Sequence, residues 1–130
     1  MTRMISDIMA TKLVIFAPDT DIHKAIHILL EKRISGAPVV DNDGNLVGVL
    51  SKKDGLKIIF STAYHQDRGG PVHQYMSKDV HTLDAGTDLI SATEHFLNAP
   101  YRRFPVLYNG KLAGQVSRHD ILKALIEDDF

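Results

Sequence analysis

The sequence contains no cysteine among its 130 residues. Without cysteine the chain has no disulfide scaffold, no cysteine-based zinc site, no iron–sulfur cluster and no thiol nucleophile. This absence is compatible with a reducing compartment, and we expect a cytoplasmic protein. A chain of this length buries roughly two-thirds of the surface that its unfolded form exposes, so it needs neither a metal nor a disulfide to stabilise a core.

The sequence also lacks a strong charge of either sign and a long apolar run. Lys and Arg number 15 and Asp and Glu number 16, which gives a formal net charge of -1. A nucleic-acid-binding protein normally carries a basic excess, so this balance argues against nucleic acid as a partner. The longest apolar runs, Leu13 to Ala17 and Ile58 to Phe60, are far shorter than the roughly 20 residues that span a bilayer, and the N-terminus has no signal-peptide pattern. We therefore expect no membrane partner.

The chain contains an internal duplication. The segment Thr20-Asp21-Ile22 returns 67 residues later as Thr87-Asp88-Leu89. After the first copy's hairpin turn, which has one extra residue, the offset falls to 66, so that Asp54 returns as Asp120. A slip confined to a turn is what a duplication predicts. The sequence indicates a first repeat over residues 1–64, a polar linker over 65–70 and a second repeat over 71–130.

Each repeat shows the same order of hydrophobic periods, which predicts strand, helix, strand, strand, helix. Thr20 and Thr87 are expected to cap the first helices, and an apolar stripe from Ile22 to Leu30 should face a core. The expected strands are Leu13 to Phe16, Ala37 to Asp41 and Leu46 to Ser51, then Val80 to Leu83, Phe104 to Tyr108 and Leu112 to Ser117. The final helices should share apolar faces made by Leu56, Ile59, Phe60 and Ala63 and by Leu122, Leu125 and Ile126.

These elements predict an α+β fold of two β-α-β-β-α repeats. The core of one repeat is too small to be secure alone, so we expect the two to pack sheet to sheet about a pseudo-twofold axis. A ligand site is then expected in the cleft that the two repeats share.

Two stretches carry a resemblance to a known family. The first runs from Ser35-Gly36-Ala37-Pro38-Val39 through Leu46-Val47-Gly48 to Ser51 and Asp54. The second runs from Arg103-Phe104-Pro105-Val106 through Gly114 to Ser117 and Asp120. Together they resemble a tandem pair of cystathionine β-synthase (CBS) domains, or Bateman module, over nearly the whole chain. The resemblance implies a stand-alone, non-catalytic sensor that binds an adenosine-containing ligand and often forms a homodimer.

The pattern Ser-x-x-Asp at the start of each final helix has two interpretations. In the first, the serine caps the helix and the carboxylate lies in its first turn, near exposed N–H groups. In the second, the ionised Asp54 or Asp120 accepts hydrogen bonds from the two hydroxyls of a ribose, each worth about 1.5–3 kcal/mol. The interpretations are compatible, because a cap can hold the carboxylate in the geometry that the ribose needs.

The resemblance implies two sites, each joining the first strand and the turn before Pro-Val of one repeat to the Ser-x-x-Asp of the other. The first comprises Ser51, Lys53, Asp54, Met76, Val80, His81, Tyr101, Arg102, Arg103, Phe104 and Pro105. The second comprises Met9, Leu13, Val14, Ile34, Ser35, Gly36, Ala37, Pro38, Ser117, His119 and Asp120.

Charge favours the first of these sites for a nucleotide, because phosphate needs concentrated positive charge and Arg102, Arg103 and Lys53 supply it. The second site offers Ser35 and Gly36 at the corresponding turn, which suits an S-adenosyl compound. It is also compatible with a short phosphate chain held by Arg118 and His119, or with no ligand. We expect AMP, ADP, ATP or S-adenosylmethionine as a regulatory ligand, with no required cofactor and no metal. The regulated partner protein is not indicated by the sequence.

The competing hypothesis is a structural module for dimerisation or protein docking, with both clefts blocked. It predicts an exposed apolar face and no stabilisation by nucleotides. An enzyme is disfavoured, since the sequence shows no nucleophile elbow, P-loop or paired carboxylates. His23 and His27 have chelating spacing, but no third ligand is near them in the sequence.

Overall fold

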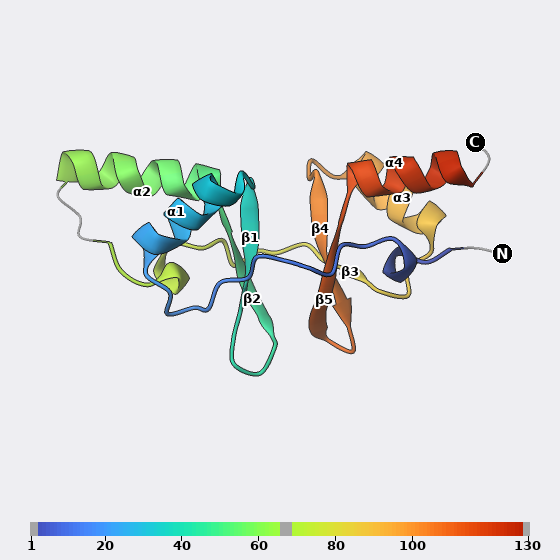
Figure 1. The fold of residues 1–130 in the computed structure, drawn as a ribbon, viewed down its shortest axis with the longest axis horizontal. Coiled ribbons are helices and arrows are strands. Elements are labelled where there is room, and N and C mark those ends of the chain that lie inside the picture. Colours follow the sequence, from blue (N-terminus) through green and yellow to red (C-terminus); the bar gives the residue numbers. More distant parts are fainter. Residues whose placement is uncertain (1–2, 66–68, 129–130) are drawn as a thin grey trace. The chain divides into compact units, whose positions relative to one another are not determined.

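A computed structural model of the chain describes residues 3–65 and 69–128, and for residues 63–65 it describes the backbone alone. The predicted place of the Ala63 side chain on an apolar helix face lies outside this description. Residues 66–68 of the predicted linker lie outside it too. The described part contains four α-helices and two small sheets (Figure 1), which confirms the α+β fold with two repeats.

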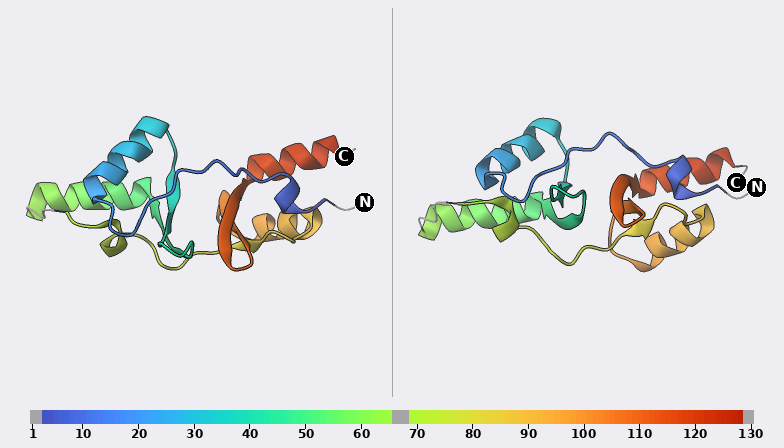
Figure 2. Two further views of the ribbon diagram at one scale, coloured as in Figure 1. Left: turned by 60° about the horizontal axis from the view of Figure 1, so that its bottom comes forward. Right: turned by 90° about the horizontal axis from the view of Figure 1, so that it is seen from below.

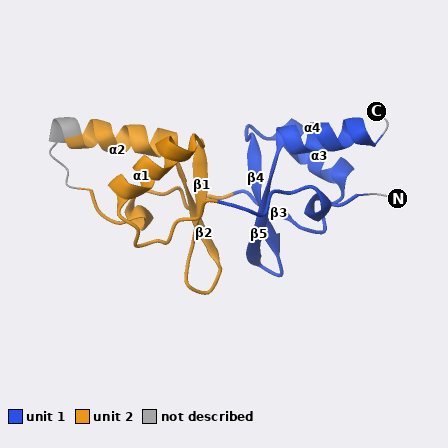
Figure 3. Ribbon diagram, in the orientation of Figure 1, with its two compact units in different colours: residues 1–13, 81–130 blue, residues 14–80 orange. Residues whose placement is uncertain are grey.

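The chain forms two compact units, and their boundaries differ from those of the repeats (Figure 3). Unit 2 comprises residues 14–80, and unit 1 comprises residues 1–13 together with 81–130. Each unit therefore contains most of one repeat plus the segment that opens the other repeat.

Unit 2 is built on an antiparallel hairpin of β1 (Gly36–Val40) and β2 (Leu46–Ser51). Helices α1 (Ile22–Lys32) and α2 (Lys52–His65) contact each other, and a short 3-10 turn, η2 (Val72–Gln74), completes the unit. Its core consists of Phe16, Ile22, Ala25, Leu29, Ala37, Val39, Leu50, Ile58 and Val72.

Unit 1 repeats this arrangement around a three-stranded sheet. The strand order is β3 (Leu83–Asp84), β4 (Arg103–Tyr108), β5 (Lys111–Ser117), with β3 parallel to β4 and β4 antiparallel to β5. Helices α3 (Leu89–Asn98) and α4 (Arg118–Glu127) contact each other, and η1 (Ile5–Asp7) adds the buried Ile5. Its core consists of Ile5, Leu83, Ala85, Leu89, Ala92, Phe96, Phe104, Val106, Val116, Ile121 and Ala124.

The segment that opens each repeat packs into the unit of the other repeat. In unit 1 the N–H of Ile5 donates to the carbonyl of Thr87 at 2.9 Å, and Ala10 pairs with Gln115. In unit 2 the N–H of Val72 donates to the carbonyl of Thr20 at 2.8 Å. Both views of Figure 2 draw η1 among the elements of unit 1. Neither unit is therefore made of one repeat alone.

The expected first strands are shorter than predicted. The first shrinks to a single parallel bridge between Phe16 and Val39, and the second becomes β3. The N–H of Val40 donates to the carbonyl of Phe16 at 2.9 Å, and the next ladder bond toward the N-terminus would need a donor at Pro38. Because proline has no N–H, the ladder cannot continue. Pro105 stands in the same place beside β3.

The predicted threonine caps are wrong by one residue. Asp21 accepts the N–H of Lys24 at 3.0 Å at the start of α1, and Asp88 accepts the N–H of Ser91 at 2.8 Å at the start of α3. The hydroxyl of Thr20 instead accepts the N–H of Ala17, which closes the preceding turn. Aspartate is as good a cap as threonine, so the sequence signal was ambiguous.

The predicted apolar faces of the final helices reach the cores only in part: Leu125 packs against the core of unit 1, but most of the other predicted residues are exposed. Leu56 is 73% exposed and Leu122 is 63% exposed, whereas Ile58 and Ile121 are buried. Ile59, Phe60 and Ile126 are also exposed, and so is Leu30 at the end of the stripe on α1. Each final helix therefore buries a narrow stripe and leaves a second apolar stripe exposed. Among the described residues, no helix combines the length and the hydropathy of a membrane span.

Candidate functional site

The Ser-x-x-Asp pattern of unit 2 is a reciprocal helix cap. The N–H of Asp54 donates to Ser51 Oγ at 3.1 Å, and the N–H and hydroxyl of Ser51 both donate to Asp54 Oδ2 at 2.9 Å. Such a box satisfies backbone N–H groups that the helix leaves without partners. It also fixes the carboxylate of Asp54 at the N-terminus of α2, where the helix dipole favours negative charge.

Unit 1 contains the same cap at the start of α4. The N–H of Ser117 donates to Asp120 Oδ2 at 2.9 Å, and the N–H of Asp120 donates to Ser117 Oγ at 3.1 Å. Both boxes use only Oδ2 of the aspartate. Within residues 3–65 and 69–128, no hydrogen bond reaches Oδ1 of Asp54 or Asp120, and both residues are only partly buried. Each carboxylate can thus cap its helix through one oxygen and accept hydroxyl hydrogen bonds through the other.

The turn before each Pro-Val strand is tied to the adjacent helix. In unit 2 the N–H of Lys52 donates to the carbonyl of Ser35 at 2.8 Å, and in unit 1 the N–H of Arg118 donates to the carbonyl of Arg102 at 2.9 Å. A weaker contact of 3.5 Å joins the Arg118 guanidinium to the carbonyl of Ala99. These bonds place each turn beside the Ser-x-x-Asp of the same repeat.

Unit 1 carries an aromatic step beside this turn. Phe104 is buried and meets Phe96 edge to face, with ring centroids 4.8 Å apart. Tyr101 lies against Phe104 with centroids 5.8 Å apart, and the exposed His81 lies over Tyr101 at 4.9 Å. The step runs from the core to the surface, so it offers an apolar edge of the kind that a purine packs against.

Positive charge gathers at the same end of unit 1. The side chains of Arg102, Arg103 and Arg118 are exposed, and none of them forms an ion pair with a described residue. Arg103 lies opposite Ser117 in the ladder of β4 and β5. Guanidinium groups that are not neutralised by a carboxylate are suited to bind phosphate oxygens in pairs.

The matching turn of unit 2 is small and has no arginine. Ser35 is exposed, and Gly36 lies opposite Ser51 in the ladder of β1 and β2. A Cβ at Gly36 would lie 2.9 Å from the carbonyl oxygen of Leu50, so a larger residue would push the two strands apart. Ile34 packs on the core of unit 2, and Ala37 and Pro38 are buried.

Most of the remaining predicted site residues belong to the segments that open the repeats, and Lys53 and His119 lie on α2 and α4. Met76 and Met9 each cover a glycine of the neighbouring strand, Gly48 and Gly114 respectively. Both methionines also pack against the core of their unit. Leu13, Val14 and Val80 are partly buried, and Lys53 and His119 are exposed.

The structure brings the predicted residues together as two half-sites, one in each unit, and each half-site contains residues from both predicted sites. Unit 2 unites Ile34, Ser35 and Gly36 with Ser51 and Asp54. Unit 1 unites His81, Tyr101, Arg102, Arg103 and Phe104 with Ser117 and Asp120. Both predicted sites combine residues of unit 1 with residues of unit 2, so their assembly remains a prediction.

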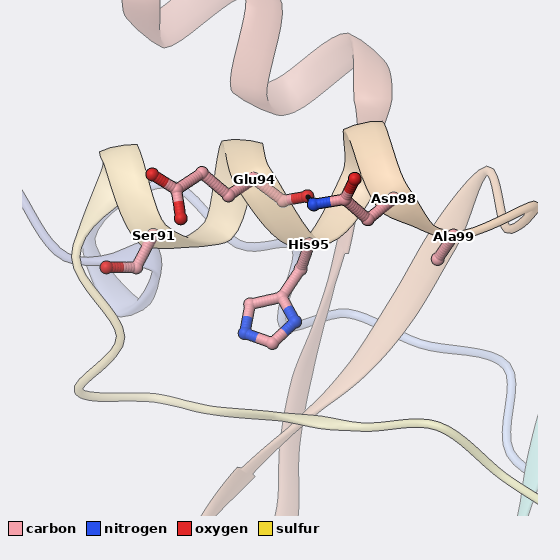
Figure 4. Close-up of a pocket in the computed structure, with 5 residues that line it drawn as sticks. All are labelled: Ser91, Glu94, His95, Asn98 and Ala99. Atoms are coloured by element: carbon pink, nitrogen blue, oxygen red, sulfur yellow. Dashed lines mark hydrogen bonds between the residues drawn. The ribbon is translucent and has the colours of Figure 1, made fainter.

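Two features of unit 1 were not predicted. Arg118 joins the arginine turn through its backbone and side chain, and the repeat could have indicated this, since Lys52 holds the equivalent place in unit 2. The second is a hollow of about 380 Å³ along α3. Figure 4 shows its lining residues Ser91, Glu94, His95, Asn98 and Ala99, none of which belongs to a predicted site. No sequence motif pointed to it.

Comparisons with known proteins agree with the duplicated architecture. The CBS domain family matches residues 5–61 and again residues 72–127. An uncharacterized 17.7 kDa protein of Acidianus ambivalens is 31% identical over 128 residues, which are 98% of this chain and 76% of that protein. The A-adding tRNA nucleotidyltransferase of Aquifex aeolicus is 32% identical over 124 residues, which are 95% of this chain but 14% of the enzyme.

Solved structures show the same fold. CBSX2, a CBS-pair protein of Arabidopsis thaliana, has been crystallised in complex with AMP. That structure superposes with a TM-score of 0.84 at 28% identity, covering 98% of both chains. The chain therefore belongs to the CBS domain family and contains two CBS domains, as the resemblance in the sequence implied.

Proposed function

We propose that this chain is a non-catalytic regulatory module that binds an adenosine-containing ligand between its two CBS domains. The observation that carries the proposal is the pair of capped aspartates, each of which keeps Oδ1 available to a ligand. CBSX2, which binds AMP, supports an adenine nucleotide as the first ligand to test.

In the preferred site, Asp54 would accept the ribose hydroxyls while unit 1 holds the rest of the nucleotide. The aromatic step of His81, Tyr101 and Phe104 offers an apolar surface to the adenine. Arg102 and Arg103 carry no ion pair with a described residue and would bind the phosphate. Ser51 and Lys53 from unit 2, with Met76, Val80 and Pro105, complete the proposed lining.

The second site would use Asp120 for the ribose and the Ser35-Gly36 turn opposite it. This turn contributes no guanidinium, so the site suits an S-adenosyl compound or a nucleotide with a short phosphate chain. His119 and Ser117 would lie beside the ligand, with Met9, Leu13, Val14, Ile34, Ala37 and Pro38 as the apolar lining.

Regulation would follow from population shift. A ligand that contacts Asp54 in one unit and Arg103 in the other favours whichever arrangement of the units makes both contacts. A partner protein that distinguishes these arrangements would be regulated through reciprocal linkage.

Calorimetric titration with AMP, ADP, ATP and S-adenosylmethionine tests the ligand. We expect at least one of them to bind, and Asp54→Ala to weaken nucleotide binding about ten- to a hundredfold, because a charge-assisted hydrogen bond is lost. Asp54→Asn is the matched variant, since an amide oxygen can keep the helix cap while the charge is removed. If none of the four compounds binds the native chain, the proposed ligand class is wrong.

We also propose that the chain forms a homodimer, because apolar side chains remain exposed on its helices. Leu56 and Ile59 on α2 and Leu122 and Ile126 on α4 are each at least 47% exposed. Contiguous apolar surface on a helix marks an interaction face more often than an ordinary surface. Analytical ultracentrifugation tests this directly, and Leu56→Glu together with Leu122→Glu should shift the chain toward the monomer.

A further inference from the structure

We propose that Asn109, at the tip of the β4–β5 hairpin, is a modification site at which water replaces the side-chain amide by an acid. The reaction needs neither an enzyme nor a cofactor, and it is separate from the proposed ligand sites. It follows from the sequence of the turn, its backbone conformation, its exposure and its hydrogen bonding.

The hairpin between β4 and β5 closes through a loop of two residues (Figure 1). Tyr108 pairs with Lys111 in the ladder, so Asn109 and Gly110 alone form the loop. Their φ angles are 50° and 79°, and positive φ at both residues is the mark of a type I′ turn. Asparagine and glycine are the residue types that enter this left-handed region most readily. The turn therefore favours an Asn-Gly pair at this place.

The groups that would react are exposed and have no partner in the described part of the chain. Neither the side-chain amide of Asn109 nor the N–H of Gly110 forms a hydrogen bond with residues 3–65 or 69–128. Both residues are exposed, and a Cβ built at Gly110 would meet no atom within 4 Å. Rotation of the Asn109 backbone can therefore bring the two groups together without displacing a neighbouring side chain.

The modification proceeds through a cyclic imide. The backbone nitrogen of Gly110 attacks Cγ of Asn109 and loses its proton, while the side-chain nitrogen leaves as ammonia. Water then adds to one of the two imide carbonyls, and cleavage of that carbon–nitrogen bond gives aspartate or isoaspartate. In sum, one water is consumed and one ammonia is released. The chain gains one negative charge, because a carboxylate replaces a neutral amide.

The equivalent turn of unit 2 already contains an acid and is braced. There Asp43 precedes Gly44, whose N–H donates to the carbonyl of Asp41 at 3.1 Å. Oδ1 of Asp41 also accepts the N–H groups of Asp43 and Asn45, both at 2.9 Å. Tyr108 holds the place of Asp41 in the second repeat, so unit 1 has no carboxylate there. The comparison indicates that an Asp-Gly pair suits such a hairpin and that the brace is specific to unit 2.

The other asparagines of the chain serve as internal controls. Asn42, Asn45 and Asn98 are not followed by glycine, so a side chain lies next to each attacking nitrogen. Nδ2 of Asn45 donates to Asp41 Oδ2 at 3.2 Å, and Nδ2 of Asn98 donates to the carbonyl of Glu94 at 3.0 Å. These two amides are held in place, whereas that of Asn109 is not.

The two products differ in their effect on the hairpin. Aspartate leaves the backbone unchanged and tolerates the left-handed region. Isoaspartate adds a carbon atom to the backbone of the loop, which disfavours the pairing of Tyr108 with Lys111. Arg103 stands at the other end of β4, roughly 17 Å away at about 3.3 Å per residue, beyond the Debye length of about 8 Å. The added charge should therefore leave the half-site of unit 1 unaffected.

Mass spectrometry of the native chain tests the proposal. The chain is incubated in mildly alkaline heavy-oxygen water and then digested with trypsin in ordinary water, so that the label separates this reaction from any during digestion. Residues 104–111 form one tryptic peptide, in which Asn109 is the sole asparagine. We expect Asn109 to convert at least about tenfold faster than Asn45 or Asn98, equivalent to a barrier lower by about 1.4 kcal/mol. Conversion should accelerate as the pH rises, because the deprotonated nitrogen attacks.

Either of two outcomes would overturn the proposal. Conversion of Asn109 no faster than that of Asn45 and Asn98 would show that the turn gives no advantage. An Asn109 that stays intact in the folded chain, yet reacts in the isolated peptide 104–111, would show that the fold protects it.

The variant Asn109→Asp tests the product separately. It should fold, match the first acidic species of the incubated chain in isoelectric focusing, and bind AMP as the native chain does. Failure to fold would contradict the fit of an acid in this turn, and a loss of AMP affinity relative to the native chain would contradict its independence from the half-site. If the native chain does not bind AMP, the proposed ligand is wrong while the labelling result at Asn109 stands.

Discussion

The two half-sites share one scaffold and differ in the turn that precedes the Pro-Val strand. Both units contain a Ser-x-x-Asp box. In both, the N–H of the residue after the serine donates to a carbonyl in the turn before the Pro-Val strand. In unit 1 that turn carries Arg102 and Arg103 beside stacked aromatic rings, whereas in unit 2 it carries Ser35 and Gly36. The comparison separates the elements that position a carboxylate, which both copies have, from the charge and the aromatic rings of the turn, which only unit 1 has.

Each unit contains the segment that opens the other repeat, and substitutions in these two segments test whether both units depend on them equally. Ile5 and Val72 occupy equivalent places and are both fully buried. Ile5→Ala should lower the free energy of unfolding by about 2–5 kcal/mol, and Val72→Ala by roughly 1–3 kcal/mol, because less volume is removed. Urea denaturation followed by circular dichroism measures both. Equal losses below 1 kcal/mol would mean that the exchanged segments contribute little.

The two methionine–glycine contacts provide a narrower comparison. A Cβ at Gly48 would lie 2.5 Å from Met76 Sδ and 2.8 Å from the carbonyl oxygen of Ser77. A Cβ at Gly114 would lie 2.7 Å from both Met9 Sδ and the carbonyl oxygen of Ala10. Since backbone cannot move aside as a side chain can, Gly48→Ala and Gly114→Ala should each destabilise by about 1–3 kcal/mol.

Gly55→Ala is the matched control for these glycines. Its Cβ would lie 3.5 Å from Ile26, an ordinary contact, within the helix α2. Alanine is the better helix former by about 1 kcal/mol, so this variant should be as stable as the native chain or more stable. If thermal denaturation shows all three variants to be equally stable, the close approach at the strands is not important.

The arginine turn should distinguish phosphate from nucleoside. Replacing Arg102 and Arg103 with alanine should weaken AMP binding about tenfold or more, because phosphate contacts with guanidinium are lost. Adenosine binding should change less than twofold. Ser35→Ala is the control in the other half-site and should leave AMP affinity at the preferred site unaltered. Calorimetry of both ligands against the three proteins decides the matter, and an equal loss for adenosine would contradict the phosphate role.

The smallest expected effect concerns the cap of α3. Hydrogen bonds from the backbone N–H and the hydroxyl of Ser91 lower the pKa of Asp88. A carboxylate whose pKa is lower in the folded chain stabilises the fold above its unfolded pKa, and that stabilisation is lost as the pH falls through the folded value. Asp88→Asn should therefore flatten the acid limb of the melting temperature against pH. An unchanged acid limb would exclude Asp88 as a contributor.

The sequence predicted the order of elements well, because the duplication repeats every signal twice. Strands β1, β2, β4 and β5 and all four helices lie where the hydrophobic periods placed them. The shortened first strands depend on a missing N–H at Pro38 and Pro105, which lie on the neighbouring strand. A period measured along one segment cannot report the hydrogen-bonding capacity of another.

The apolar faces of the final helices show a different limit. Leu56 and Leu122 were predicted to face a core, yet both are exposed. A hydrophobic pattern indicates which face of a helix is apolar, but it does not indicate which surface that face packs against. The two sites were predicted as lists of residues, yet the use of a single carboxylate oxygen by each cap and the contact of the His81 ring with Tyr101 depend on side-chain geometry. The compact units also differ from the repeats, because the opening segments pack outside the repeat to which they belong in the sequence.

This exchange of segments sets an order of events during synthesis. Unit 2 is continuous from residue 14 to residue 80, so all of its contacts can form as soon as that stretch has left the ribosome. Unit 1 needs Ile5 and also the strands and helix that end near residue 127. The apolar side chains of the segment around Ile5 therefore stay uncovered until residues near 127 have been translated, and the contacts that then form join residues far apart in the sequence.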